Sequence, residues 1–571
     1  MKPWWEIYPE RFQFELDALR QEGIPFEIDK EALERGACIL YVTISVGQFT
    51  NLRLKVAFPA MYPKMRFEIS SEDLDLHHHQ NPFTKSLCLI GRATENWDTS
   101  DYVAKYLKER LPVVIEAGLS SEMETVAEME ERQGEPITDY YFYAENSIIL
   151  IDSDWAIDPS VQRGVLEIGL NEAVGKVFRG AVLSVQDISR HALAQADAAI
   201  YGAYPDKIIG RWYRLDAPPR LSDWNDIYQE IVKRDASFRI PQWENARGTK
   251  ISVTGILFPE ETRWRQNGDG WLFIVHVEQQ TNKKGQPKRG ISLVRPGRAG
   301  RTDFLERNPS LRGIEGKKVA VFGLGCLGAP SVLEFARCGI GELRILDYDV
   351  VDPATVVRWP FGLKMAGGKL KTHALACFLA DNYPFTKVIP INHYMGDTQN
   401  PDMEAKILDV MLDGIDLIYD ATAEIGIQHV LSELAAERKI PYMMVSATDG
   451  VWGGRVVRIS PGRTQGCWMC YMKLLADECI RSPLFDPAGK VLPVGCAAPT
   501  FTGTNFDAGE IVLAGVRMAI STLMEKIDGG YPQISWDVAV ANLRNSEGNI
   551  IAPDWKTYEI EKHPDCCGKR E

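Results

Sequence analysis

The chain has 571 residues, which predicts about three domains of about 150 residues each. Hydrophobic residues make up 45% and charged residues 25%, as in ordinary globular proteins, and no apolar run reaches the roughly 20 residues that span a bilayer. The formal net charge of −14 argues against nucleic acid or an anionic membrane as a partner. An odd count of eleven cysteines and a start without an apolar signal core favour reduced thiols in the cytoplasm.

The first predicted domain, residues 1–140, carries an ordered series of landmarks. An apolar strand leads into the turn Phe58-Pro59-Ala60-Met61-Tyr62-Pro63. Next come His79-Gln80-Asn81-Pro82, Cys88 between two leucines, Trp97, and a helix predicted over residues 102–115. Three consecutive histidines, 77–79, cannot converge on one metal ion, because adjacent side chains of an extended segment point to opposite faces. We therefore expect a solvated loop there.

This order of landmarks resembles the ubiquitin-conjugating fold, an α+β fold. The resemblance implies that Cys88 forms a thioester and that Asn81 stabilises the oxyanion when a target lysine attacks. Gln80 replaces the proline of the family's His-Pro-Asn segment, and the spacing to the cysteine is one residue shorter. The residues alone also fit a buried core cysteine or a binding module without catalysis.

The second predicted domain, residues 141–300, is a β-rich connecting domain in which no chemistry is visible. Polar turns separate its short apolar runs, which lie at 147–151, 182–185, 250–258 and 271–277. The basic segment 295–312, punctuated by glycine and proline, is typical of a linker.

The third predicted domain, residues 301–571, opens with a glycine-rich turn. A strand over 319–322 leads into Gly323-Leu324-Gly325-Cys326-Leu327-Gly328 and a helix, and a second strand ends in Asp347-Tyr348-Asp349. The glycines let the backbone approach a phosphate at a helix N-terminus, and the acid suits a ribose hydroxyl. This pattern alone fits a Rossmann dehydrogenase. Two later cations, Arg358 and Lys371, instead suit a triphosphate under attack.

That arrangement resembles the Rossmann-like α/β adenylation domain (ThiF/MoeB type) of ubiquitin-activating enzymes and of bacterial enzymes that adenylate ThiS and MoaD. The resemblance implies ATP and Mg²⁺, with Asp347 on the ribose and Arg358 and Lys371 at the phosphates. The family's asparagine falls at Thr355 and its magnesium aspartate at Ala423, so we expect Asp420 or Asp349 to take the metal. The resemblance also implies a homodimer in which Arg301 or Arg298 completes the partner's site.

Cys496 is a candidate second nucleophile, in Gly495-Cys496-Ala497-Ala498-Pro499-Thr500. A buried helical face is predicted beyond it at Val512, Val516, Ala519 and Leu523, with Asn505 or Asp507 as the cap. A helix N-terminus stabilises a nearby thiolate, as attack on an acyl-adenylate requires. The position resembles the cysteine loop of activating enzymes, although a structural cysteine also fits.

A structural zinc site is implied by the same resemblance. Cys467 and Cys470 form a C-x-x-C pair, and the adjacent Cys566 and Cys567 lie near the C-terminus. Tetrahedral zinc needs four nitrogen or sulfur donors, and His563 competes for one of these places. A thioredoxin-type redox motif is disfavoured, because no suitable strand–helix pattern surrounds Cys467.

Together the two resemblances predict an α/β multidomain fusion of conjugating-type and activating-type domains, similar to the ligases of bacterial CBASS antiphage operons. They imply that a protein modifier with a free C-terminus, a cGAS/DncV-like nucleotidyltransferase or a ubiquitin-like protein, is adenylated and joined to target lysines. The modifier's acyl group is expected to pass from the adenylate formed with ATP to Cys496, then to Cys88, and finally to a lysine. The alternative is a sulfur-carrier (ThiS/MoaD-type) adenylyltransferase with a non-catalytic N-terminal module.

Overall fold

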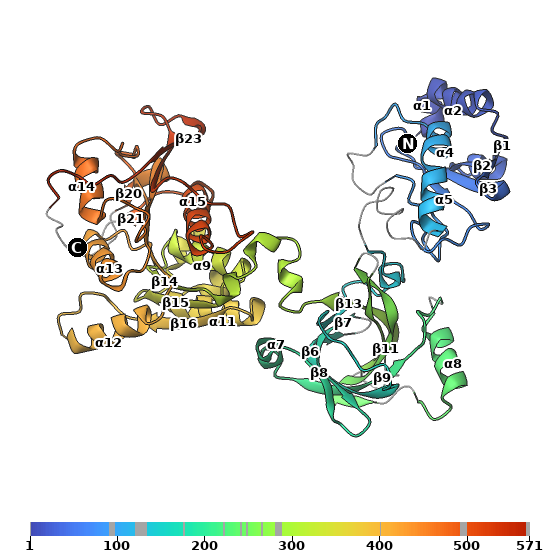
Figure 1. Ribbon diagram of the computed structural model, residues 1–571, viewed down its shortest axis with the longest axis horizontal. Helices are drawn as coiled ribbons and strands as arrows, with labels where there is room; N and C mark the ends of the chain where they lie inside the picture. The colour runs from blue at the N-terminus through green and yellow to red at the C-terminus, as the bar shows by residue number, and fades with distance from the viewer. Residues whose placement is uncertain are drawn as a thin grey trace. The chain divides into compact units, whose positions relative to one another are not determined.

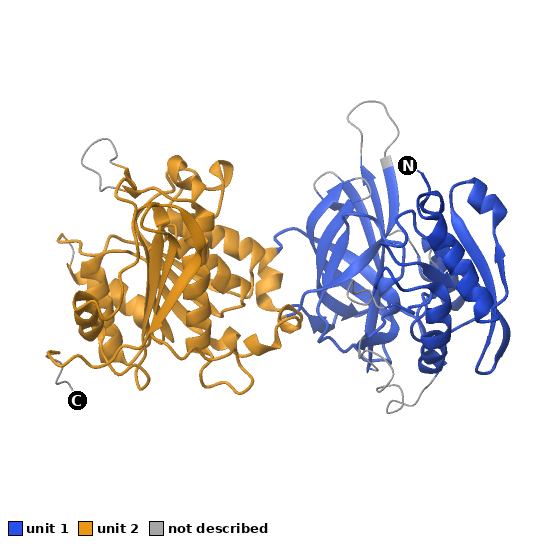
Figure 2. Ribbon diagram, turned by 90° about the horizontal axis from the view of Figure 1, so that it is seen from above, with its two compact units in different colours: residues 1–196, 204–300 blue, residues 197–203, 301–571 orange. Residues whose placement is uncertain are grey.

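In a computed structural model the chain divides into two compact units, residues 1–196 with 204–300 and residues 197–203 with 301–571 (Figure 2). The structure describes residues 2–566 except 91–96, 120–133, 175–176, 221–222, 240–242, 247–248, 264–265, 280–287, 400 and 492–499. None of the helices in these described ranges is both long and apolar enough to cross a bilayer.

The first unit begins with an antiparallel sheet in the order β1-β2-β3-β4, accompanied by helices (Figure 1). The helix predicted over 102–115 is divided at Arg110, because Pro112 has no N–H to continue the hydrogen-bond ladder. The elements are α1 (Trp4–Ile7), α2 (Pro9–Gln21), β1 (Phe26–Ile28), α3 (Lys30–Glu34), β2 (Cys38–Val46), β3 (Phe49–Phe58), β4 (Glu68–Ser70), α4 (Val103–Glu109) and α5 (Leu111–Leu119).

The rest of the first unit is one sheet that closes on itself, which we call the closed sheet. Its strands follow the order β11-β12-β13-β5-β7-β6-β9, and parallel pairing of β9 with β11 completes the ring. All four predicted apolar runs lie in its strands, except that residue 147 precedes β5. The elements are η2 (Ile137–Asp139), β5 (Ile148–Ile151), β6 (Arg163–Val174), β7 (Val177–Asp187), β8 (Ala192–Gln195), β9 (Lys207–Arg214), α8 (Trp224–Arg234), β10 (Glu244–Ala246), β11 (Thr249–Arg263), β12 (Gln266–Gln279) and β13 (Lys288–Arg298).

The second unit is built on an eight-stranded sheet in the order β16-β15-β14-β17-β18-β19-β22-β23. The first five of these strands are mutually parallel and the last three are joined by antiparallel pairing. Its strands are β14 (Lys318–Phe322), β15 (Glu342–Asp347), β16 (Lys387–Asn392), β17 (Leu417–Asp420), β18 (Tyr442–Ala447), β19 (Gly453–Ile459), β22 (Val538–Arg544) and β23 (Ile550–Tyr558), with β20 (Lys490–Val491) pairing β21 (Thr500–Phe501) outside the sheet.

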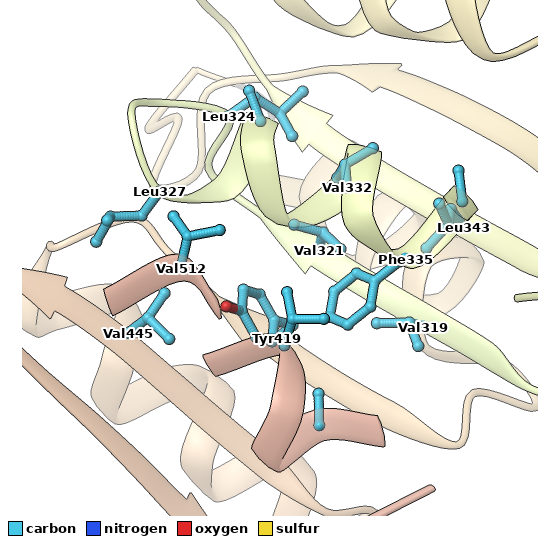
Figure 3. Close-up of a cluster of buried hydrophobic side chains, with 14 of the residues drawn as sticks. Val319, Val321, Leu324, Leu327, Val332, Phe335, Leu343, Tyr419, Val445 and Val512 are labelled. Carbon is cyan, nitrogen blue, oxygen red and sulfur yellow. The ribbon is translucent and has the colours of Figure 1, made fainter. Parts of the chain in front are cut away.

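Helices cover both faces of this sheet, so its central strands are apolar throughout. Val319 and Val321 of β14 face the core that contains Phe335, Tyr419 and Val512 (Figure 3), whereas Ala320 and Phe322 face the opposite core. The helices are α7 (Ala198–Ala203), η3 (Asp303–Leu305), η4 (Pro309–Leu311), η5 (Ile314–Gly316), α9 (Gly328–Arg337), η6 (Pro353–Val357), α10 (Leu363–Ala366), α11 (Lys371–Asn382), α12 (Pro401–Leu412), α13 (Ile425–Arg438), η7 (Asp449–Val451), α14 (Trp468–Ala476) and α15 (Asn505–Leu523).

The helix predicted after Cys496 is α15, and all four predicted core residues on it are buried. Its N-cap residue is Thr504, one residue before the predicted Asn505. The Thr504 hydroxyl donates to Asp507 at 3.3 Å, so Asp507 supports the first turn from within the helix.

Candidate active site

The glycine turn joins β14 to α9. Two of its glycines are closely surrounded by backbone, whereas the third, Gly325, has open space beside it. Gly323 has φ of +83°, and a Cβ there would lie 2.9 Å from the backbone of Ala421, so only glycine fits. A Cβ on Gly328 would lie 1.8 Å from the Gly323 carbonyl oxygen. A Cβ on Gly325 would meet no atom of the described residues within 4 Å. This open turn at the N-terminus of a helix fits the close approach of a phosphate.

Two acids and a lysine lie beside the turn. Asp347, at the end of β15, accepts the backbone N–H of Leu324 at 2.6 Å and that of Asp349 at 2.8 Å, so its carboxylate braces the turn. Lys371 begins α11, and its Nζ lies 2.8 Å from Asp349 Oδ2 and 3.9 Å from Asp347 Oδ2. The structure thus brings together three of the residues expected around ATP.

Arg358 lies at the end of η6 and contacts β21 rather than these acids. Its Nη2 donates to the Thr500 hydroxyl at 2.6 Å, and its Nη1 donates to the Phe501 carbonyl. The neighbouring Trp359 was not singled out from the sequence, yet its indole N–H donates to the Leu324 carbonyl at 2.9 Å and supports the glycine turn. Residues around η6 therefore connect the turn with the segment that follows residues 492–499.

Asp420 does not fit the metal-binding role expected for it. Its side chain is fully buried at the end of β17. One oxygen accepts the Thr422 N–H and hydroxyl at 2.9 and 2.7 Å, and the other accepts the Tyr442 hydroxyl at 2.9 Å. Burial raises the pKa of this carboxyl above its ordinary value. Asp349, with 49% of its side chain exposed, is the better magnesium candidate.

Three of the predicted zinc ligands converge. The Sγ atoms of Cys467, Cys470 and Cys566 all lie within 4.8 Å of one another, with Cys467 3.8 Å from Cys470 and 3.6 Å from Cys566. Zinc–sulfur bonds of about 2.3 Å in a tetrahedron place sulfurs about 3.8 Å apart, and two of the three sulfur pairs lie near that separation. Cys567 lies outside the described residues.

His563 is engaged elsewhere. Its Nε2 lies 2.8 Å from Asp477, and its Nδ1 accepts the backbone N–H of Asp565 at 3.1 Å. Both ring nitrogens are therefore committed, and His563 does not fit as the fourth ligand in this arrangement.

In the first unit, Cys88 lies on a hairpin formed by residues 79–88. Its backbone N–H donates to the His79 carbonyl at 2.8 Å, and Gln80 forms a bridge with Leu87. The Cys88 side chain is half-buried, unlike the flanking leucines, which are buried. Leu87 and Leu89 belong to the buried core of the N-terminal sheet, whereas Cys88 between them is only half-buried.

Asn81 and Gln80 hold the hairpin in shape. The Asn81 side-chain oxygen accepts the backbone N–H groups of Phe83 and Thr84 at 2.9 and 3.0 Å. Gln80 is buried in place of the family's proline, and its amide bonds to the backbone at Leu76 and Ser71. The side-chain amides of Gln80 and Asn81 therefore hold the hairpin in shape by hydrogen bonds to the backbone.

The expectation of a solvated histidine loop is wrong for two of the three residues. His78 and His79 keep only 12% and 13% of their side chains exposed, and their Nδ1 atoms lie 3.5 Å from Glu261 and 3.2 Å from Glu135. Glu135 and Glu261 belong to segments far along the chain. No sequence pattern could have indicated this contact, because it depends on the docking of the N-terminal sheet and the closed sheet.

The other predicted site residues are placed as follows. Cys496 lies outside the described residues. Arg301 bonds to Asp197 at 3.0 Å and stacks on Phe385, while Arg298 donates to the Thr262 carbonyl at 2.8 Å. Both arginines therefore have partners within their own units.

Residues 303–504, which contain the glycine turn, Asp347 and Lys371, match the ThiF family. The chain thus carries a ThiF/MoeB-type, Rossmann-like adenylation domain. It is also 30% identical over 592 aligned residues to the uncharacterized protein y4oA of Sinorhizobium fredii, covering 99% of this chain and 97% of the relative. The chain belongs to the same family as y4oA.

Two further similarities each cover less than half of the chain. It is 27% identical over 278 residues to ubiquitin-like modifier-activating enzyme 5 of Drosophila sechellia, covering 44% of this chain and 66% of that enzyme. A crystal structure of Escherichia coli MccB with ATP is similar at 17% identity and a TM-score of 0.33, covering 45% of this chain and 67% of MccB.

Proposed function

We propose that the protein is an ATP-dependent ligase that activates a protein modifier through its C-terminus and joins it to target lysines in bacterial antiviral defence. The modifier is a ubiquitin-like protein or a cGAS/DncV-like nucleotidyltransferase. The observation that carries the adenylation step is the gathering of Asp347, Asp349 and Lys371 beside the open position at Gly325.

In the first reaction a carboxylate oxygen of the modifier attacks the α-phosphorus of ATP. An acyl–phosphate bond forms, the bond from the α-phosphorus to the bridging oxygen breaks, and pyrophosphate leaves. The open turn receives phosphate oxygens, Asp347 accepts the ribose hydroxyl, and Lys371 stabilises phosphate charge. Asp349 is the residue that would hold Mg²⁺, which neutralises phosphate charge when bound.

In the later reactions two thiols carry the acyl group. The Cys496 thiolate attacks the acyl-adenylate carbonyl and AMP leaves; the Cys88 thiolate then attacks the Cys496 thioester. A lysine amine finally attacks the Cys88 thioester, loses a proton and releases the Cys88 thiolate. Because the Asn81 oxygen is already bonded within the hairpin, its NH₂ group is the end that would face the oxyanion.

Two structural features complete the proposal. A zinc ion held by Cys467, Cys470, Cys566 and Cys567 would fasten the C-terminal segment to the start of α14. Homodimerisation, as in other adenylating enzymes, would place two glycine turns in one assembly.

Trapping the thioesters on non-reducing gels tests the relay, because a thioester survives SDS but not added thiol. With ATP and modifier, Cys496→Ala should form no adduct while pyrophosphate exchange continues. Cys88→Ala should load Cys496 but yield no amide product. Cys377→Ala, at an exposed cysteine of α11, is the matched control and should behave like the wild type.

The opposite results are equally informative. Conjugation by Cys88→Ala at the wild-type rate would show that the N-terminal domain is a binding module. The C-terminal half would then be left as an adenylyltransferase of the sulfur-carrier type.

A further inference from the structure

We propose that Glu135 is a positioning residue for Cys88: it holds His79 in the backbone conformation on which the thiol-bearing hairpin depends. Glu135 lies just before η2 and is itself held by the closed sheet. The inference rests on the proposed role of Cys88 in acyl transfer, and it gives the closed sheet a part in that chemistry.

His79 has an unusual backbone. Its φ is +62°, in the left-handed region, which is disfavoured for residues with a side chain because Cβ crowds the following carbonyl oxygen. This conformation matters for Cys88, since the His79 carbonyl accepts the Cys88 N–H at 2.8 Å. Relaxation of His79 would redirect that carbonyl and release the residue that carries the thiol.

Glu135 contacts both the backbone and the ring of His79. Its Oε2 accepts the His79 backbone N–H at 2.8 Å, and its Oε1 lies 3.2 Å from the ring Nδ1. Burial alone would raise the pKa of Glu135, but its hydrogen bonds and attraction to His79 lower it below the ordinary value. The group is therefore an ionised carboxylate at neutral pH, suited to hold two N–H donors.

The closed sheet fixes Glu135 in turn. The Glu135 backbone N–H donates to Glu261 Oε2 at 3.1 Å, and the same oxygen lies 3.5 Å from His78 Nδ1. The preceding residue, Glu260, accepts the N–H and hydroxyl of Thr138 at 3.1 and 3.0 Å. Two consecutive acids of β11 thus anchor the segment that carries Glu135.

The tip of the hairpin is also supported by the closed sheet. Phe83 packs against the apolar cluster of the closed sheet that includes Tyr141, with ring centroids 5.2 Å apart. The hairpin is therefore held at its tip by Phe83 and at its base by Glu135. Such support matters for catalysis, because a displacement of about 1 Å at a reacting group can cost on the order of 10²-fold in rate.

Substituting glycine for His79 distinguishes a positioning role of Glu135 from a general loss of folding. Glycine adopts positive φ without steric cost, so His79→Gly removes the need for the carboxylate. The full-length variants are Glu135→Ala, Glu135→Gln, His79→Gly and the double variant Glu135→Ala/His79→Gly. Glu116→Ala, at an exposed glutamate of α5, is the matched control.

Two measurements are made on each variant: the rate of modifier transfer from Cys88 to lysine, and hydrogen exchange of the Cys88 amide in the peptide 84–90. Glu135→Ala should slow transfer and speed amide exchange by about tenfold or more, with pyrophosphate exchange unchanged. Glu135→Gln, which keeps an acceptor oxygen, should be affected less. The double variant should recover most of both properties.

Wild-type transfer by Glu135→Ala would overturn the inference, as would a double variant no better than Glu135→Ala. If the wild type forms no adduct at Cys88, the proposed function fails. Amide exchange still tests whether Glu135 fixes the hairpin, so the two failures can be told apart.

Discussion

The Arg358 guanidinium lies over the ring of Phe501, with its Cζ 4.5 Å from the ring centroid. The arginine expected at the ATP phosphates is therefore attached to the strand that directly follows residues 492–499. Phosphate oxygens and this strand would compete for one guanidinium. In the proposed mechanism, such competition couples occupancy of the nucleotide site to the segment containing Cys496.

Separating Arg358 from Phe501 should reveal this competition. Phe501→Leu removes the ring, and a cation–π contact at an exposed site contributes about 0.5–1 kcal/mol. We expect the KM for ATP in pyrophosphate exchange to fall about two- to fivefold, because the arginine becomes more available. Arg358→Ala should raise the same KM at least about tenfold. A higher KM in Phe501→Leu would argue against the competition.

Lys371→Ala should reduce pyrophosphate exchange by about 10²-fold or more, because it removes a cation held beside the glycine turn. Loss of the lysine also removes the cation that pairs with Asp347 and Asp349, which adds to repulsion of the phosphates. Lys364→Ala, at an exposed lysine of α10, is the matched control. Unchanged exchange in Lys371→Ala would remove this lysine from the phosphate site.

Glu260 should make the stability of the first unit depend on pH. Burial raises its pKa from an ordinary value of 4.5 to about 7, so the folded state binds a proton that the unfolded state releases. Stability from this group is therefore complete below pH 4.5 and is lost as the pH rises to about 7, by about 3 kcal/mol in total. Denaturant unfolding of the first unit between pH 5 and 8 should show this fall in the wild type.

Glu260→Gln tests the assignment, because it keeps an acceptor for Thr138 but cannot ionise. Its unfolding free energy should change less over the same pH range. Equal pH slopes for the two proteins would mean that another group is responsible.

Purified protein should contain about one zinc per chain, measured by mass spectrometry of the metal. Cys470→Ser should lower this content and the melting temperature of the second unit, because Cys470 is the buried member of the sulfur cluster. Cys479→Ser changes an exposed cysteine outside the cluster and should keep the metal. Full metal content in Cys470→Ser would exclude this site.

Local pattern was enough to predict the glycine turn, its two flanking strands and the buried face of α15. Each leaves a signal in a short stretch of sequence: a glycine stands where Gly323 has a positive φ, and β14 is a continuous apolar run, as expected of a strand buried on both faces. The family resemblance offered Asp420 as a substitute for the magnesium aspartate that is replaced by Ala423. Asp420 is buried, and one of its oxygens accepts the hydroxyl of Tyr442 in the next strand.

The sequence by itself determined the glycine turn, the apolar strand runs and the residue types available for phosphate and thiol chemistry. Tertiary structure decided which of them meet. Glu135 reaches His79 across 56 residues, Arg358 reaches Phe501 across 143, and β9 closes the sheet by pairing with β11. Such contacts leave no periodic signal in the sequence, because they are set by the packing of whole elements and by the free energy of burying charged groups with partners.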